Sequence, residues 1–168
     1  TGGGGMVITN KKKIAKKIKH LTTTAKIKHK WEYIHDEIGY NFRMPNLNAA
    51  LGLAQIEKIH IFLKAKRVLF KKYFKVFKNI KGISLYKEPK NAKSNYWLQT
   101  LILNNNYLNL KNKILKKSHK KLIFLRPAWR LINELKPYRK KQKMNLSGAK
   151  EIYKKIINLP SSQSLVLK

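Results

Sequence analysis

The sequence has no cysteine, few acidic residues and no long apolar run. Without cysteine the chain can form neither disulfides nor thiolate metal sites, and a cytoplasmic setting is expected. No apolar run approaches the roughly 20 residues that span a bilayer, and no signal peptide is visible, so no membrane partner is expected. Hydrophobic residues make up 43% of the chain, which is enough for a packed core.

The scarcity of acidic residues leaves a net charge of +32, which raises the question of a nucleic-acid partner. Only five of the 39 basic residues are arginine, so lysine supplies 34 (39 minus 5), and the lysines are spread over every segment. Specific nucleic-acid readers favour arginine, whose planar guanidinium binds phosphates and guanine edges through two hydrogen bonds. We therefore interpret the charge as solvated surface and expect no nucleic acid. A weak, nonspecific polyanion binder is the alternative that composition leaves open.

The first 80 residues contain the patterns of one strand and two helices. A short apolar stretch at 6–9 predicts a buried strand after the glycine run, and 11–20 predicts an amphipathic helix with a basic outer side. Residues 21–45 show little periodicity and predict a long functional loop. Asn46 can cap a helix that runs to about residue 80, because apolar residues recur at helical spacing. Such a long helix commonly links domains or lines a dimer interface.

After residue 80 the pattern is that of a small α+β domain. Runs of aromatic and β-branched residues predict strands, and 3.6-residue periodicity predicts helices. The predicted strands are 83–86, 96–103 and 122–125, and the predicted helices are 108–118 and 149–157.

One segment carries a family resemblance. Residues 35–52, HDEIGYNFRMPNLNAALG, resemble the signature of the DegT/DnrJ/StrS family of fold-type I sugar aminotransferases, which depend on pyridoxal 5′-phosphate (PLP). Residues 1–10, the RPAW of 126–129 and the NLPSS of 158–162 agree in order and spacing. Within the family, the sequence of these motifs most resembles the branch that makes 4-amino-4,6-dideoxy-N-acetylhexosamine nucleotides for surface sugars such as legionaminic acid. The resemblance covers essentially the whole chain.

The resemblance implies an α/β fold in three parts. Residues 1–45 would be the last part of the large PLP-binding domain, 46–80 a linking and interface helix, and 81–168 the small α+β C-terminal domain. In this branch the lysine that forms the Schiff base with PLP lies a few residues before the threonine–glycine run. We therefore expect that lysine upstream of Thr1, no catalytic residue in this chain, and a C-terminal fragment that is inactive alone.

The resemblance also assigns binding residues. The implied cofactor-binding residues are Asn41, Gly2, Gly3, Tyr40 and Arg43. Asn41 would reach the PLP phosphate of the other subunit in a homodimer, and small residues would let the glycine run pass close to the cofactor. The implied substrate-binding residues are Arg126, Trp129 and Tyr138, since arginine suits a diphosphate and tryptophan stacks on a sugar or base.

The activity that the resemblance implies is transfer of an amino group, from glutamate, to a UDP-linked 4-keto-6-deoxy sugar for surface polysaccharide synthesis. The alternatives are an inactive remnant and a basic nucleic-acid-binding module. Two stretches depart from the family. The KKLIFL of 120–125 stands where the family carries glycine and small polar residues, and Arg130 stands where a smaller or apolar residue is usual.

Four residues of metal-ligand type lie close together in the sequence. They are His29, His35, Asp36 and Glu37. Their spacing fits no metal motif such as HExxH, and isolated histidines are more often structural, so no metal is expected.

Overall fold

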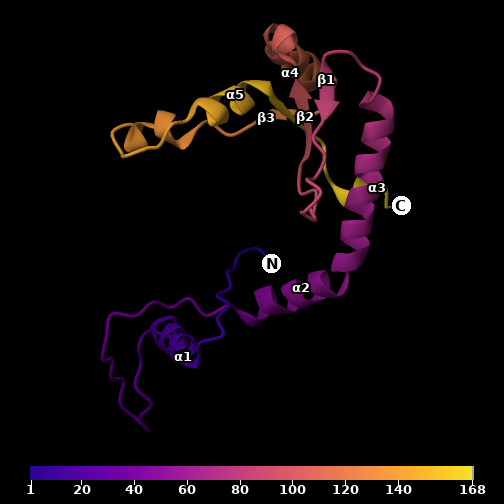
Figure 1. The fold of residues 1–168 in the computed structure, drawn as a ribbon. Helices are drawn as coiled ribbons and strands as arrows, with labels where there is room; N and C mark the ends of the chain where they lie inside the picture. The colour runs from indigo at the N-terminus through magenta and orange to yellow at the C-terminus, as the bar shows by residue number, and fades with distance from the viewer. Residues whose placement is uncertain (168) are drawn as a thin grey trace. The chain divides into compact units, whose positions relative to one another are not determined.

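The computed structural model describes residues 1–167, which divide into two compact units, Thr1–Ile59 and His60–Lys168. The first unit contains helices α1 (Lys12–Leu21) and α2 (Asn46–Glu57) (Figure 1). The second unit contains three helices: α3 (Ile59–Phe77), whose first residue still belongs to the first unit, α4 (Lys111–Lys120) and α5 (Ser147–Lys155). It also contains four strands: β1 (Ile83–Leu85), β2 (Gln99–Leu103), β3 (Arg126–Pro127) and β4 (Ile156–Leu159). Within the described residues no helix is both long enough and apolar enough to cross a membrane.

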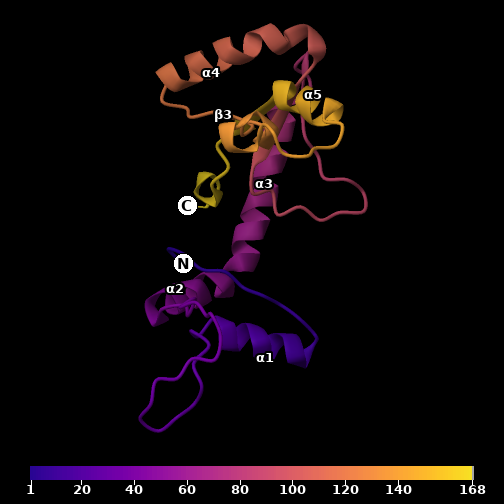
Figure 2. The ribbon, with the colours of Figure 1, turned by 90° about the vertical axis from the view of Figure 1, so that its left-hand side faces the viewer.

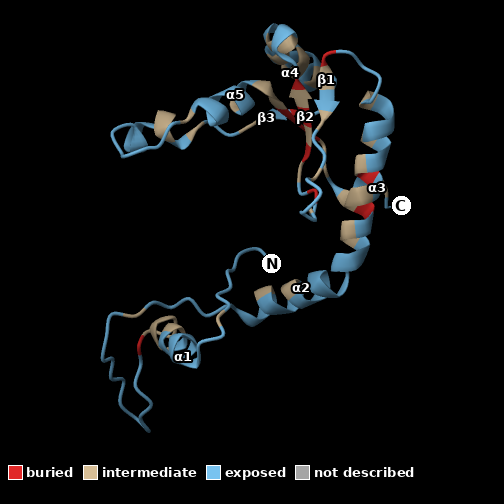
Figure 3. Cartoon of the chain, viewed as in Figure 1, coloured by how far each residue is buried: buried red, intermediate tan, exposed pale blue. Residues whose placement is uncertain are grey.

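The first unit has almost no core of its own. Ala25 is the one buried residue among residues 1–59 (Figure 3). Residues 6–9 form no strand, and Met6, Val7 and Ile8 are 81%, 65% and 85% exposed. The prediction of a buried strand here was wrong, because no strand among residues 1–167 lies beside this segment to share backbone hydrogen bonds. Residues 22–45 form no helix or strand, as predicted for the loop over 21–45, and contain only two isolated bridges; the functional role of this loop stays a prediction.

The helix predicted over 46–80 is two helices. Lys58 separates α2 from α3 with φ −100° and ψ 2°, and its N–H donates to the carbonyl of Gln55, three residues back, at 3.2 Å. This tight final turn ends α2, so the prediction of one continuous helix was wrong at this residue. The division of the chain into domains at 45 and 80 stays a prediction.

An antiparallel sheet forms the centre of the second unit. Its strand order is β1-β2-β4-β3, so β4, the last strand in sequence, lies between β2 and β3. Burial alternates strictly along β2, which hides Gln99, Leu101 and Leu103 and leaves the two intervening residues partly exposed. This alternation is what a period-2 strand with one covered face requires.

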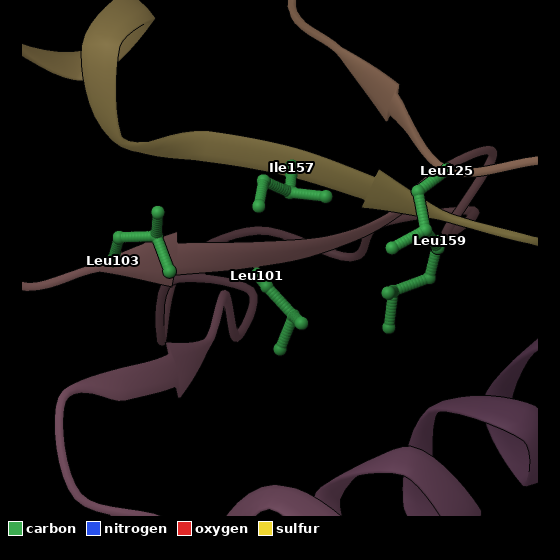
Figure 4. Packing of buried hydrophobic residues seen from close by; sticks show 5 residues of the cluster. All are labelled: Leu101, Leu103, Leu125, Ile157 and Leu159. Atoms are coloured by element: carbon green, nitrogen blue, oxygen red, sulfur yellow. The ribbon is translucent and has the colours of Figure 1, made fainter. Parts of the chain in front are cut away.

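The core lies on one side of this sheet. Leu101 and Leu103 of β2, Ile157 and Leu159 of β4 and Leu125 form the buried cluster (Figure 4). Partly buried side chains from α3, β1, η1 (a 3-10 helix, Asn105–Leu110) and α4 pack against it: Tyr73, Phe77, Ile83, Leu85, Leu108, Ile114 and Leu115. The predicted small α+β arrangement is therefore confirmed.

Two boundaries of this sheet differ from prediction. Residues 122–125 were predicted as a strand but form the turn after α4, and the strand follows at Arg126–Pro127. Strand β4 was not predicted, since 149–157 was interpreted as a helix that stops at Asn158. The two isoleucines at 156 and 157 suit a helix end as well as a strand, and only their pairing with β2 selects the strand.

Candidate functional site

A cationic pocket opens at the β3–β4 edge of the second unit. It has a volume of about 330 Å³. Its lining includes two cationic side chains, Lys66 of α3 and Arg126 of β3, and no carboxylate. The remaining lining residues come from the segment before β2, from Phe124 and from the end of β4 onward. A pocket with two positive charges and no negative one suits an anionic ligand.

Lys66 holds the rim of this pocket together. Its ammonium group donates to the backbone carbonyl of Trp97 at 3.2 Å and also to that of Ser161. Burial lowers the pKa of Lys66, because a charged amine loses hydration there. The hydroxyl of Tyr73 donates to the carbonyl of Pro160 at 2.9 Å, so α3 fixes the segment after β4 at two neighbouring residues.

Arg126 is held by its backbone and leaves its side chain available. It pairs with Asn158 of β4 in the sheet, and the Asn158 side chain accepts a hydrogen bond from Thr100 at 2.9 Å. The Arg126 guanidinium is exposed and has no hydrogen-bond acceptor or salt-bridge partner among residues 1–167. Its donors are therefore free for a ligand's anionic group.

Two tryptophans border the pocket. Trp97, one of the lining residues, stacks on Trp129 with ring centroids 5.7 Å apart and an 18° angle between the planes. The residues are 62% and 71% exposed, an unusual state for such large apolar rings. An exposed aromatic face beside a cationic pocket can stack on a base or a sugar ring.

The predicted substrate residues are only partly brought together. Arg126 lines the cationic pocket, and Trp129 reaches its edge through Trp97. Tyr138 lines a different cavity, of about 620 Å³, which Trp129 also borders. Arg126 and Tyr138 therefore share no cavity, and Trp129 lies between their two sites.

Sequence reasoning missed several residues of this pocket: Lys66, Trp97, Asn158 and Ser161. The NLPSS stretch at 158–162 carried a signal, because it matched the family in order and spacing. Lys66 carried none, since one lysine among 34 has no mark in the sequence.

The predicted cofactor loop lies in the first unit. Residues 40–42 run beside 21–24: the N–H of Tyr40 donates to the Leu21 carbonyl at 2.7 Å, and that of Phe42 to the Thr22 carbonyl at 3.0 Å. The rings of Tyr40 and Phe42 stack at 5.2 Å. Gly39 makes this approach possible, because a Cβ there would lie 2.3 Å from the backbone carbon of Thr24.

The turn that receives this loop is strained. Thr24 and Ala25 have φ of +67° and +50°, a left-handed conformation that residues other than glycine rarely adopt. Such strain concentrates at functional sites. The strained residues directly follow Thr23, whose backbone forms a bridge with Asn41.

The glycine run meets the same loop. A cavity of about 830 Å³ is lined by Gly3, Gly4 and Gly5 on one side and by Phe42, Arg43 and Met44 on another. Asn48 of α2 ties the run down through its amide, which donates to the carbonyls of Thr1 and Gly3 at 2.5 and 3.3 Å. Of the predicted cofactor residues, Gly3 and Arg43 line this cavity, whereas Gly2, Tyr40 and Asn41 do not.

The loop has donors that suit a phosphate-bearing group. Within the described part of the chain, the Asn41 amide and the Arg43 guanidinium have no acceptor, and the N–H groups of residues 2–5 donate to no carbonyl. An amide, a guanidinium and exposed backbone N–H groups are the donors that bind phosphate oxygens. Their chemistry fits a phosphate group, and of these donors Arg43 and residues 3–5 line the cavity, whereas Asn41 does not.

The residues of metal-ligand type that lie together in the structure are not all those that are neighbours in the sequence. The structure brings His20, not His29 or His35, within 4.8 Å of ligand atoms on Asp36 and Glu37. Ion pairs account for the cluster: His20 contacts Asp36 at 2.6 Å, Lys17 binds Glu37, and the His20 hydrogen bond lowers the pKa of Asp36. The expectation that no metal is held stays a prediction.

Comparison with known proteins gives the family of this chain. The sequence profile of the DegT/DnrJ/EryC1/StrS aminotransferase family matches residues 1–168. The chain belongs to that family. The expected resemblance is thus confirmed.

Two relatives of this chain carry names that refer to nucleotide sugars. The chain is 32% identical over 165 residues to GDP-perosamine synthase of Escherichia coli O157:H7, covering 98% of this chain and 44% of that protein. It is 28% identical over 174 residues to the UDP-4-amino-4,6-dideoxy-N-acetyl-beta-L-altrosamine transaminase of Helicobacter pylori, covering 99% and 45%. The chain thus spans less than half the length of these relatives.

Solved structures of the family share the fold. Helicobacter pylori PseC, an aminotransferase of pseudoaminic acid biosynthesis, superimposes with a TM-score of 0.86 at 24% identity, over 95% of this chain and 43% of that one. The sugar aminotransferase Spr1654 of Streptococcus pneumoniae gives 0.81 at 18% identity, over 97% and 42%. The α/β fold of fold-type I PLP enzymes, predicted from the sequence, is confirmed.

Proposed function

We propose that this chain is the C-terminal part of a PLP-dependent enzyme that transfers an amino group, from glutamate, to a nucleotide-linked 4-keto-6-deoxy sugar. The product would enter surface polysaccharide or glycan synthesis in the cytoplasm. The single observation that carries the substrate side is the cationic pocket bordered by stacked tryptophans, since a nucleotide sugar combines a diphosphate with flat or apolar rings. The names of the relatives support the same substrate class.

In this proposal Arg126 binds the diphosphate. Its unpaired guanidinium can donate two parallel hydrogen bonds to phosphate oxygens. Lys66 adds positive charge from the pocket wall while it keeps the rim in place. Trp97 and Trp129 offer a stacking surface to the base or the sugar, and Tyr138 lies in the cavity on the far side of Trp129.

The cofactor side rests on the loop of the first unit. PLP, when bound, supplies an electron sink that lets a proton leave the carbon attached to the amino nitrogen. Asn41 would hold the phosphate of the cofactor in the neighbouring subunit of a homodimer, with Tyr40 and Arg43 fixing its loop. Gly2 and Gly3 would let the backbone pass close to the cofactor of their own subunit.

The chain alone is expected to bind but not to transaminate. The Schiff-base lysine is expected upstream of Thr1, so the residues described here position ligands rather than exchange the proton. The competing hypothesis is an inert remnant of such an enzyme. The coding sequence upstream of Thr1 separates the two: an in-frame Asn-Lys a few codons before it, after a large N-terminal domain, supports the enzyme, and a stop codon or frameshift there contradicts it.

Nucleotide binding by the 168-residue chain tests the substrate side. Titration calorimetry with UDP and with GDP should detect binding of one of them, and Arg126→Gln should weaken it about tenfold or more, as expected for loss of a charged hydrogen bond. Arg139→Gln is the matched control, since Arg139 is exposed and lines neither the cationic pocket nor the cavity beside Trp129. Equal affinity of both variants would contradict the proposed role of Arg126. Covalent pyridoxal on a lysine of this chain would contradict the placement of the catalytic lysine.

A further inference from the structure

Helix α4 presents a face made of lysine. Lys113, Lys116, Lys117 and Lys120 recur at the spacing of one helix face, and all four are exposed. The opposite face carries Ile114 and Leu115, which pack against the core of the sheet. No aspartate or glutamate occurs between Glu88 and Glu134, so no carboxylate in this part of the sequence offsets the charge.

The end of α4 is a tightly bonded turn with an unusual residue in it. The N–H of Ile123 donates to the Ser118 carbonyl at 2.9 Å, and that of Leu122 to the His119 carbonyl at 3.0 Å. These two bonds form a Schellman motif, whose left-handed position normally holds glycine. Here it holds Leu122, with φ of +59°. No burial of the Leu122 side chain offsets this backbone strain, since Leu122 is 78% exposed.

Three consecutive apolar residues are exposed at this turn. Ile123 and Phe124 follow Leu122 with 47% and 59% exposure, and Leu125 then enters the core. Figure 2 shows the backbone that leads from the end of α4 to β3. His119 fixes the turn, because its Nε2 lies 2.7 Å from the Leu125 carbonyl oxygen and its ring contacts that of Phe124 edge-on. The turn therefore displays its apolar side chains in a defined conformation rather than in a loose loop.

We infer that the α4 tip, defined as the lysines 113, 116, 117, 120 and 121 with the apolar residues Leu122 and Ile123, is a docking surface for an anionic lipid bilayer. The lysines match a negatively charged headgroup layer, and Leu122 with Ile123 enters the boundary of the acyl chains. This contact lies on the membrane surface and needs no spanning segment, so it departs from the expectation of no membrane partner, which rested on the lack of a long apolar run. It does not depend on the proposed aminotransferase activity.

A bilayer fits this surface better than a nucleic acid does. The α4 tip contains no arginine, the residue that grips phosphates through two hydrogen bonds. Leucine and isoleucine cannot stack on bases, whereas an acyl-chain boundary accepts them. The combination of clustered positive charge and adjacent exposed hydrocarbon is therefore complementary to anionic lipid.

Vesicle co-sedimentation of the full chain tests the inference. The chain should bind phosphatidylcholine vesicles that contain phosphatidylglycerol and should not bind pure phosphatidylcholine vesicles. The quadruple variant Lys113→Gln, Lys116→Gln, Lys117→Gln and Lys120→Gln should bind at least a hundredfold more weakly, because each lysine near an anionic surface contributes about a fivefold factor. The charge-matched control changes four exposed lysines of α1, at 12, 13, 16 and 19, and should lose far less.

Leu122→Gly separates the apolar contribution from charge. Glycine suits the left-handed position, so this variant keeps the fold while it removes the side chain, and it should bind anionic vesicles about tenfold more weakly. Equal losses in the α1 and α4 variants, or unchanged binding of Leu122→Gly, would overturn the inference in favour of attraction by net charge alone. Tighter binding of an RNA oligonucleotide that depends on the α4 lysines but not on Leu122 would assign the surface to nucleic acid instead.

Discussion

The guanidinium of Arg67 on α3 grips the carboxylate of Glu88 through two hydrogen bonds, of 2.7 and 3.0 Å. Glu88 also accepts a hydrogen bond from the Ser94 N–H at 2.6 Å, and Arg67 donates to the Ser94 carbonyl at 2.8 Å. The segment between 88 and 94 is thereby closed against α3. Two residues after Ser94, the ring of Tyr96 stacks on that of Phe70 of α3, with centroids 4.5 Å apart. The Arg67–Glu88 pair and this stack therefore fix the segment that leads to Trp97 in the cationic pocket.

The Arg67–Glu88 ion pair predicts that the folded chain loses stability in acid. The hydrogen bonds from Arg67 and Ser94 hold the pKa of Glu88 at about 2, below its ordinary 4.5. Because the folded pKa is the lower one, the contribution of Glu88 to stability is present above about pH 4.5 and is lost as pH falls toward 2. Urea unfolding over that range should show this loss in the wild-type chain, and Glu88→Gln should be less stable at neutral pH.

The two stability curves should approach each other as pH falls through 2, because Glu88 then becomes neutral in the folded wild type and matches the uncharged glutamine of the variant. Glu134→Gln is the control, since Glu134 is 41% exposed and 3.9 Å from Arg130, and its curve should follow the wild type. Parallel curves for wild type and Glu88→Gln would contradict the assigned role of the pair.

Truncation of the core should destabilise the second unit strongly. Leu103 is 1% exposed at the centre of the buried cluster, so Leu103→Ala should lower the free energy of unfolding by about 2–5 kcal/mol. Met144→Ala, at a residue 87% exposed, should change it by less than about 0.5 kcal/mol. Urea denaturation followed by tryptophan fluorescence measures both. Comparable effects of the two variants would mean that the cluster is not the core.

Removal of the strained side chain at the end of α4 should stabilise the chain. Leu122→Gly relieves a left-handed leucine and should raise the free energy of unfolding by roughly 1 kcal/mol, after the entropy of glycine in the unfolded chain is counted. The neighbouring Lys121→Gly tests the reason, because Lys121 has φ of −93° and gains nothing from glycine. That control should be destabilised by about 0.5–1 kcal/mol. A destabilised Leu122→Gly would contradict the strain.

Closure of the loop at 39–42 should depend on the missing side chain of Gly39. The Cβ of Gly39→Ala would lie 2.3 Å from backbone atoms of Thr24, which cannot rotate away as a flexible side chain would. The variant should therefore lose the protection of the Tyr40 and Phe42 amides in hydrogen exchange. Gly5→Ala is the matched control, since its Cβ meets nothing within 4 Å. Unchanged protection in Gly39→Ala would show that the loop is not closed as described.

The membership of the family was predictable from the sequence, because its motifs are local. The stretch around Asn41 and the RPAW and NLPSS stretches are recognisable letter by letter, whatever they contact. Helical periodicity likewise located α1, α3 and the start of α2. Strand β2 was predicted because its alternation follows from burial of a single face.

The cationic pocket was only partly predictable. Arg126 and Trp129 stood in a motif, but Lys66 comes from a helix 60 residues earlier than Arg126 and resembles every other lysine (126 minus 66). Trp97 lines the pocket itself, and Trp129 borders the pocket only through its stack on Trp97. Such partners are chosen by packing between distant segments, which leaves no local pattern.

The sequence by itself therefore determined the family, the helical segments and the charge of this protein, since these follow from motifs, periodicity and composition. The tertiary structure alone decided that 156–159 is a strand, because pairing with β2 outweighs a pattern that suits a helix end. It alone decided that 6–9 is not a strand, because a strand requires a neighbour to bond. It also decided which of 34 lysines lines a pocket with Arg126, and that Leu122 is left-handed and exposed, since both depend on contacts that no short stretch of sequence contains.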